Sequence, residues 1–322
     1  MFLAGSEFGL DKIELPNNAN NQLNAVLGDN PLQSTLPSES SQCAKFGLAA
    51  PCSGILYSKA VSGTANQQTT WVGGIFVKAH AQNILLETVS TRQRITIESN
   101  GQQVVFEQQN TDKWLVTDNL NPSSPLLLDD SFNGIIYVAG QIGDSNCCFS
   151  SGVTNGLKGG VGPDISAKTQ LTIVATGDIA IKGDVTYTED PDQVATAKNV
   201  LGIFSPGGSI KVDGPDMQDI EIHGSLMASG MNKGFGTIAF NAHYRGDHYI
   251  HLKGGIIEQR SQGVGQFDSL TGRRTNGYGR SFSFDERFNK GFAPPFFPTQ
   301  QAWQKDVSLN INSRRLWQLV GN

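Results

Sequence analysis

Short runs in which apolar and polar residues alternate make up most of the chain, and no stretch keeps the periodicity of a long amphipathic helix. Alternation with a period of two is typical of strands that bury one face, so the pattern predicts an all-β fold. Residues 9 to about 70 are rich in Asn, Gln, Ser and Pro, which indicates loops and short strands. The one segment with helical character, Asp192–Asn199, is short.

A small antiparallel sheet is predicted in the N-terminal part. Four runs with strand character follow one another there: Trp71–Ala79, Asn83–Val89, Arg94–Ser99 and Gln103–Gln108. The Asn100-Gly101 pair between the last two runs is a strong signal for a two-residue hairpin turn.

One local form, an alternating strand followed by glycine and another apolar residue, recurs from Phe132 onward. Its full copies are Ile135–Ile142, Ile179–Val185, Ile220–Leu226 and Tyr249–Ile256, and Ser209–Gly214 is a degenerate copy. The glycines of the full copies stand at positions 140, 183, 224 and 254. Stacked coils that hide an apolar row against the next coil need such a repeat, so the pattern favours a β-solenoid. Because the spacing is irregular, an ordinary β-sandwich with Gly-rich turns is the alternative.

These patterns divide the chain into four parts. Residues 1–8 are expected to come from a cloning vector, because Gly5-Ser6-Glu7-Phe8 is what two adjacent common cloning sites encode. Residues 9–125 form an irregular region with the small antiparallel sheet, residues 126–262 the solenoid coils, and residues 263–322 a Gly-, Phe- and Arg-rich cap with a closing strand. No apolar stretch of about 18 residues is present, so membrane anchoring is expected only through a segment absent from this chain.

Charge is scarce and unevenly placed. Charged residues are 16% of the chain, against about 25% in ordinary soluble domains. Residues 231–322 hold 12 Lys and Arg against 6 Asp and Glu, so they carry +6 while the other residues carry −11. A polar, weakly charged surface favours an extracellular or cell-surface β protein over a cytoplasmic enzyme.

Four cysteines are present: Cys43, Cys52, Cys147 and Cys148. Their spacing is not that of zinc ligands, and an even number in such a chain favours disulfides formed in an oxidising compartment. Pairing of Cys43 with Cys52 is the simplest arrangement and leaves Cys147 and Cys148 as a vicinal pair. The two crossed pairings and four free thiols are the alternatives.

Several segments resemble an uncharacterised-domain family of pilus-assembly proteins in Deinococcus–Thermus bacteria. The resemblance covers residues 130–300 and is carried by Phe132–Gly140, Ile222–Ala228, Tyr278–Phe288 and Ala293–Pro298. A competence-associated minor pilin with a β-solenoid inserted in its pilin domain is the best-known member. The resemblance implies a non-enzymatic outer-surface protein of a type IV pilus system, with other pilins or pilus-tip proteins as partners and a role in DNA uptake. It also implies a pilin-like part within residues 9–125, although this chain lacks a prepilin leader and a long apolar N-terminal helix.

The C-terminal region combines basic and aromatic residues, which is the composition that nucleic-acid backbones and bases require. The residues predicted to bind DNA are Arg273, Arg274, Tyr278, Arg280, Arg287, Lys290, Arg314 and Arg315. The alternative is that Phe282, Phe284 and Phe288 cover the terminal coil while the arginines pair with Asp285 and Glu286.

Other chemistry has weaker support. His223 and His251 are candidates for a metal pair across neighbouring coils, and the carboxylates of Asp213–Asp219 for a cation-binding turn, but solvated side chains are the simpler interpretation. Asp178, Asp184 and Glu221 are the acids that a carbohydrate-cleaving β-helix would use. No catalytic or cofactor-binding fingerprint accompanies them, so we expect no enzyme activity and no cofactor.

Overall fold

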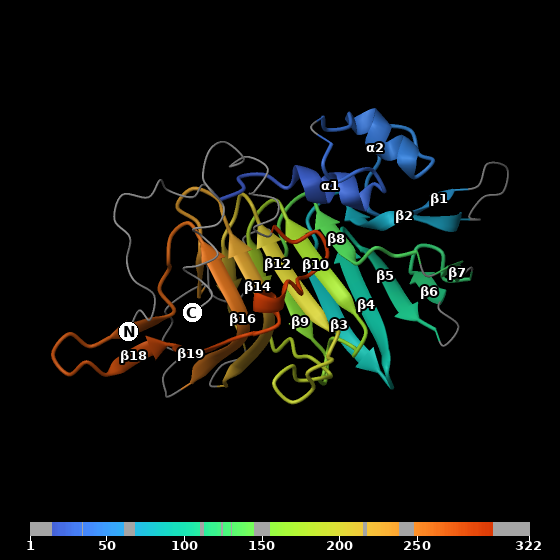
Figure 1. Ribbon diagram of the computed structural model, residues 1–322. Coiled ribbons are helices and arrows are strands. Elements are labelled where there is room, and N and C mark those ends of the chain that lie inside the picture. Colours follow the sequence, from blue (N-terminus) through green and yellow to red (C-terminus); the bar gives the residue numbers. More distant parts are fainter. Residues whose placement is uncertain are drawn as a thin grey trace, which may run out of the picture.

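The computed structural model describes residues 15–33, 35–60, 68–109, 113–123, 125–129, 131–144, 155–214, 218–237 and 248–298. Figure 1 shows strands side by side along the length of the protein, with two short helices, α1 (Asn20–Val26) and α2 (Glu39–Lys45), above one end. The prediction of a mostly β protein is confirmed. Within these residues no helix is long and apolar enough to span a bilayer.

Eight strands form the first sheet. In spatial order they are β1 (Ile55–Ala60), β2 (Gln68–Val77), β8 (Ile135–Val138), β10 (Gln170–Ala175), β12 (Val200–Ser205), β14 (Ile220–Ala228), β16 (Tyr249–Glu258) and β19 (Gly279–Phe284). The β1–β2 pair is antiparallel, and every later pair in this sheet is parallel.

Nine strands form the second sheet. In spatial order they are β15 (Phe235–Thr237), β13 (Ile210–Val212), β11 (Ile179–Ile181), β9 (Leu157–Gly159), β3 (Asn83–Val89), β4 (Arg92–Ser99), β5 (Gln102–Gln108), β6 (Lys113–Asp118) and β7 (Leu126–Asp129). Pairing is parallel from β15 to β3 and antiparallel from β3 to β7.

The chain alternates between the two sheets. After β2 in the first sheet it forms the β3–β7 meander of the second, and it then returns four times to each sheet in turn, as β8 and β9, β10 and β11, β12 and β13, and β14 and β15. Isolated parallel bridges join Ala81 to Ile142 and Ile142 to Ile179, so the connecting segments are also aligned. We call one visit of the chain to the first sheet and then to the second a passage. Each passage therefore lies directly beside the preceding one.

Alternation along each strand places one row of apolar side chains between the sheets. Ile75, Ile136, Ile173, Ile203 and Leu226 occupy directly paired positions on β2, β8, β10, β12 and β14, and all are buried. β-branched side chains suit this pleated, buried surface. Complete burial of each contributes about 1.5–3 kcal/mol, so the row links neighbouring passages energetically as well as by backbone hydrogen bonds.

The outer face of the first sheet is also apolar, because other segments cover it. Phe76, Tyr137, Val174, Phe204 and Met227 form a second in-register row that belongs to a separate buried cluster containing α1. The C-terminal segment 294–298 reaches this cluster through Phe297. A Cβ on Gly202 would lie 2.4 Å from the Phe297 ring, so glycine at that position allows the segment to approach the sheet.

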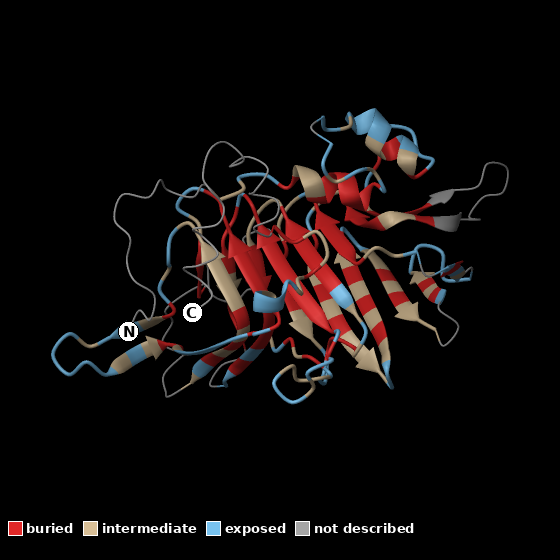
Figure 2. Ribbon diagram, in the orientation of Figure 1, coloured by how far each residue is buried: buried red, intermediate tan, exposed pale blue. Residues whose placement is uncertain are grey.

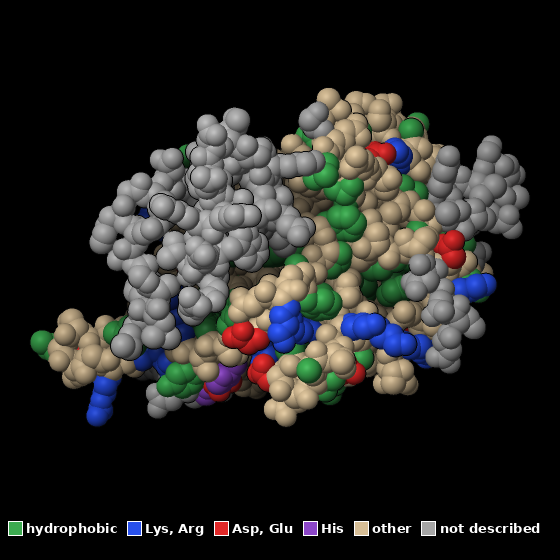
Figure 3. All heavy atoms as spheres, viewed as in Figure 1, with side chains coloured by type: hydrophobic (Ala, Val, Ile, Leu, Met, Phe, Trp, Pro, Cys, Tyr) green, Lys and Arg blue, Asp and Glu red, His purple; other side chains and the backbone are tan. Residues whose placement is uncertain are grey.

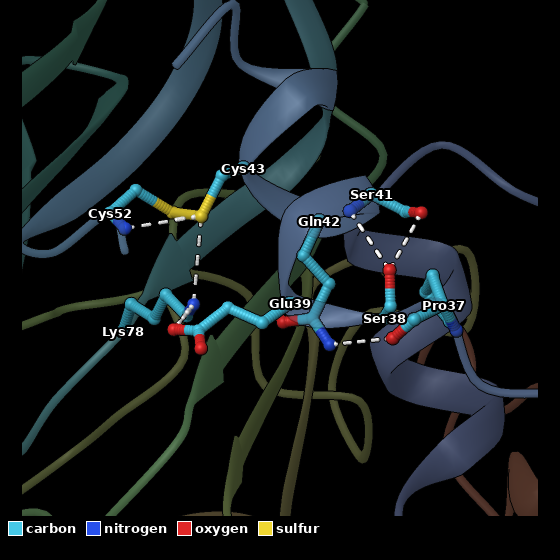
Figure 4. The surroundings of a disulfide bond; sticks show 8 residues. All are labelled: Pro37, Ser38, Glu39, Ser41, Gln42, Cys43, Cys52 and Lys78. Atoms are coloured by element: carbon cyan, nitrogen blue, oxygen red, sulfur yellow. Dashed lines mark hydrogen bonds and ion pairs between the residues drawn. A yellow bond between two sulfur atoms is a disulfide. The ribbon is translucent and has the colours of Figure 1, made fainter. Parts of the chain in front are cut away.

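A disulfide joins Cys43 on α2 to Cys52, with an S–S distance of 2.09 Å (Figure 4). Ser38 caps α2 by accepting a hydrogen bond from the Ser41 backbone N–H at 3.2 Å. Lys78, which follows β2, donates to Glu39 of the helix at 2.6 Å. The predicted Cys43–Cys52 pair is thus present, while Cys147 and Cys148 lie outside the described residues.

The structure corrects the prediction of a separate antiparallel N-terminal sheet. The β4–β5 hairpin is present with Asn100 and Gly101 at positive φ, as predicted, but β3 also pairs in parallel with β9, so the sheet is mixed. The run beginning at Trp71 belongs to the other sheet. Asp192–Asn199 contains turns and no helix.

The glycine-punctuated copies are divided between the sheets. Those containing Gly140, Gly224 and Gly254 supply β8, β14 and β16 of the first sheet, and Gly224 pairs directly with Gly254. The copy containing Ile179 and the degenerate copy containing Ile210 supply β11 and β13, which pair with each other in the second sheet. Copies with the same local form therefore occupy two different positions within a passage.

Candidate functional site

The C-terminal strands form the end of the protein to which the sequence assigns DNA contact. β17 (Gly265–Phe267) and β18 (Arg274–Gly277) make an antiparallel hairpin that projects from the body, and β19 follows as the last strand of the first sheet (Figure 1). The central strands are buried, whereas this hairpin is mostly exposed (Figure 2). The region is thus accessible to a partner.

Asp268 holds the tip of this hairpin. Its carboxylate accepts hydrogen bonds from the backbone N–H groups of Thr271 at 2.6 Å and Leu270 at 3.1 Å, and from the Thr271 hydroxyl at 2.8 Å. These bonds stabilise the ionised carboxylate and lower the pKa of Asp268. The fixed tip presents Leu270, 93% exposed, and the exposed side chain of Arg273 to solvent.

Two more arginines are oriented by aromatic rings. The Arg274 guanidinium lies 4.9 Å from the centre of the Tyr249 ring, a distance typical of a cation–π contact. Arg280 donates to the Gln262 carbonyl at 2.8 Å, and its guanidinium lies 5.9 Å from the Phe282 ring. A Cβ at position 279 would lie within 2.5 Å of both Tyr249 and Arg274, so Gly279 permits the first contact.

Two of the predicted DNA-binding residues are buried, and for them the prediction is wrong. Arg287 is 7% exposed, pairs with Asp285 at 2.6 Å, and donates to the carbonyls of Ala197 and Asn199 at 2.9 and 3.0 Å. A guanidinium that is satisfied inside the protein has no donors for phosphate. Tyr278 is 1% exposed in the core, so its ring has no free face for a base.

Lys290, at the end of the short 3-10 helix η1 (Phe288–Lys290), is exposed as predicted for a surface cation. In the described part of the chain, Arg273, Arg280 and Lys290 form no ion pair with a carboxylate. Arg314 and Arg315 lie outside the described residues. Arg273, Arg280 and Lys290 are therefore exposed cations, whereas Arg274 is partly buried.

Apolar side chains lie beside these cations. Phe282 pairs with the buried Leu252 but is 42% exposed, and it packs edge-on against Phe235 at 6.2 Å. Phe284 is 49% exposed and contacts Phe288 at 6.0 Å. These phenylalanines contact the end of the core, as the capping alternative expects, yet a large part of each remains accessible.

The histidines contact carboxylates instead of facing each other. His223 Nε2 lies 2.8 Å from Glu221, and His251 Nε2 lies 3.0 Å from Asp219. The strand register pairs Glu221 with His251, so His223 is not opposite it. Figure 3 shows acidic, basic and histidine side chains together along the lower edge of this view. The described residues contain no cluster suited to a metal ion.

The acids considered for catalysis or cation binding bind protein groups. Asp178 accepts from the Ser209 backbone N–H at 2.6 Å, and Asp184 accepts from that of Glu221 at 2.8 Å. Asp213 forms a largely buried ion pair with Lys182 at 2.5 Å. Each carboxylate thus links neighbouring passages of the chain.

Sequence reasoning missed Tyr249 as the partner of Arg274. The sequence does contain Gly279, which leaves room for this contact, but its role becomes clear only once Tyr249 is known to pair with Gly279.

Comparison of the chain with family models, curated proteins and solved structures gives no match.

Proposed function

We propose that this protein is a β-solenoid scaffold, without enzyme activity, that acts at the cell surface as a minor-pilin-like component of a type IV pilus or competence system. Support for the solenoid comes from the alternation of the chain between two sheets and from the in-register apolar rows. Repeated passages that contact only their neighbours are the defining property of a solenoid. Support for the pilus system comes from the sequence resemblance, and the Cys43–Cys52 disulfide is compatible with an oxidising compartment.

The C-terminal end then binds DNA. The observation that carries this proposal is that Arg273, Arg280 and Lys290 are exposed and free of ion pairs with described carboxylates. The exposed ring of Phe282 lies beside Arg280, and the exposed Phe267 pairs with Arg274 in the hairpin. Cations without acidic partners are available to phosphates, and exposed rings are available to unstacked bases.

Binding to DNA is tested by the salt dependence of affinity. We expect the protein to bind a fluorescent 30-base-pair duplex at 50 mM NaCl and to bind at least tenfold more weakly at 200 mM. The double variant R273E/R280E removes two cationic contacts, so the slope of log K against log [salt] becomes shallower by about 2. Anisotropy titrations measure both quantities.

The matched control is K113E/K168E, which changes charge equally at two exposed lysines on other parts of the surface. Equal loss of affinity in both double variants would show that only net charge matters and would overturn the assignment of the site. Circular dichroism and thermal unfolding verify that both variants are folded.

A structural or adhesive role without nucleic acid is the second candidate. The half-exposed rings of Phe282 and Phe284 at the end of the core favour it, because accessible aromatic residues are typical of protein-binding surfaces. Absence of wild-type DNA binding at 50 mM NaCl, combined with protein association that F282S/F284S abolishes, would support this second function over the first.

A further inference from the structure

A hollow of about 350 Å³ lies at one end of the β3–β6 meander, in the second sheet and outside the C-terminal end described above. Its wall includes Gln82 just before β3, Asn83 at the start of β3, Glu98 near the end of β4, Gln103 at the start of β5, and Asn119 and Asn155 from adjoining loops. The volume falls within the range of small-molecule sites, about 300–1,000 Å³.

Protein hydrogen bonds fix the amide groups in this wall. Asn83 accepts from the Gly156 backbone N–H at 3.1 Å and donates to Glu98 at 2.6 Å and Asn155 at 2.9 Å. Asn119 accepts from the Gln103 backbone N–H at 2.8 Å. These contacts determine which end of each amide is donor and which is acceptor, so the wall is ordered before any ligand arrives.

Hydrogen-bonding capacity remains after the internal bonds are counted. Gln82 uses its carbonyl to accept from the Asn100 N–H at 2.7 Å, and its NH₂ group has no partner among the described residues. Gln103 uses its NH₂ group to donate to Glu98 at 2.6 Å, and its carbonyl likewise has no described partner. Each oxygen of Glu98 accepts one amide hydrogen and retains a further lone pair.

The charge of the wall restricts the class of ligand. It contains one carboxylate, several amides and no cation, so the negative charge of Glu98 repels a phosphate or another anion. Neighbouring fixed donors and acceptors match groups that donate and accept at once, as sugar hydroxyls do. We propose that the Gln82–Glu98–Gln103 hollow binds a neutral saccharide through its hydroxyl groups, independently of the DNA-binding end.

The test is isothermal titration of the whole protein with four neutral oligosaccharides: maltohexaose, cellohexaose, mannohexaose and chitohexaose. We expect at least one to bind with a Kd below 1 mM. Removing one hydrogen-bonding side chain weakens a neutral contact by about three- to tenfold, so Q103A and Q82A should each raise the Kd by that factor. Q108A is the matched control, since Gln108 lies on the same strand as Gln103 but outside the hollow.

Two outcomes would overturn the proposal: no binding of any of the four sugars at 5 mM, or an equal loss of binding in Q103A, Q82A and Q108A. Using two lining variants keeps the test decisive if one of them unfolds. The R273E/R280E protein distinguishes this site from the proposed DNA site, because it should bind sugar as the wild type does even if neither protein binds DNA.

Discussion

At the scale of single residues, burial determines the chemistry of three tyrosines. Desolvation raises the pKa of Tyr57 and Tyr187, and it raises the pKa of Tyr137 from 10.0 to about 12. The folded protein therefore keeps protons that the unfolded chain releases above pH 10. The stability that these groups provide is complete below pH 10 and is lost as the pH rises toward the folded-state values.

Tyr137 gives the most direct test of this pH dependence. Above pH 10 each such tyrosine lowers the free energy of unfolding by about 1.4 kcal/mol per pH unit. The variant Y137F should match the wild type at pH 8, and its stability should fall less steeply between pH 10 and pH 11.5. Urea unfolding at four pH values measures the two slopes; identical slopes would contradict the prediction.

Residue-level predictions from the sequence succeeded where a local rule decides the outcome. The Asn100-Gly101 turn and the Cys43–Cys52 pair depend on neighbouring residues only. Arg280 and Arg287 look alike in the sequence, but one is exposed and the other buried, because the second reaches carbonyls about 90 positions earlier in the chain. The wall of the hollow was missed for the same reason: its amides come together only when β3, β5 and the loop at Asn155 are placed side by side.

At the scale of elements, Arg287 joins the segment after β19 to the loop before β12. Replacing Arg287 by Ala leaves Asp285 as a buried charge without its partner, a change that costs about 3–5 kcal/mol. R280A removes an exposed arginine nearby and should change the free energy of unfolding by less than about 0.5 kcal/mol. Urea unfolding of the two variants provides the comparison.

The double variant R287A/D285A distinguishes loss of the ion pair from independent effects of the two residues on the free energy of unfolding. Removing both charges should recover part of the stability, because no unpaired carboxylate remains inside. A double variant as unstable as the sum of the two single variants would mean that the residues act independently and that the ion pair is not the cause.

The sequence predicted strands better than it predicted their partners. Alternating runs and glycine punctuation located β4, β5, β8, β14 and β16, because these depend on local periodicity. Pairing in a parallel sheet joins segments that are tens of residues apart. The residues of a repeat copy do not indicate which of the two sheets it joins. The register between paired strands is known only from the structure, where side chains such as Ile136, Ile173 and Ile203 pack in one row.

At the scale of the whole molecule, parallel passages contact mainly their nearest neighbours, so stability should vary along the stack. Ile173 lies in a buried central row between β8 and β12, whereas Ile256 lies toward the C-terminal end and is only partly buried. Replacing a buried isoleucine by alanine costs about 2–5 kcal/mol, and a half-exposed one costs less.

Hydrogen exchange followed by mass spectrometry can test how far the loss of packing in I173A or I256A spreads to neighbouring strands. In the wild type we expect slow exchange in β8, β10 and β12 and fast exchange in the β17–β18 hairpin. I173A removes packing from both neighbouring passages, so protection should fall in β8 and β12 as well as in β10. I256A should accelerate exchange in β16 and in its partner β14 while β8 and β10 keep their protection, since Ile256 pairs with Leu226 of β14 and has no partner on β8 or β10. Uniform acceleration in I256A would instead mean that the two sheets unfold as one cooperative unit, which would contradict nearest-neighbour coupling as the basis of this fold.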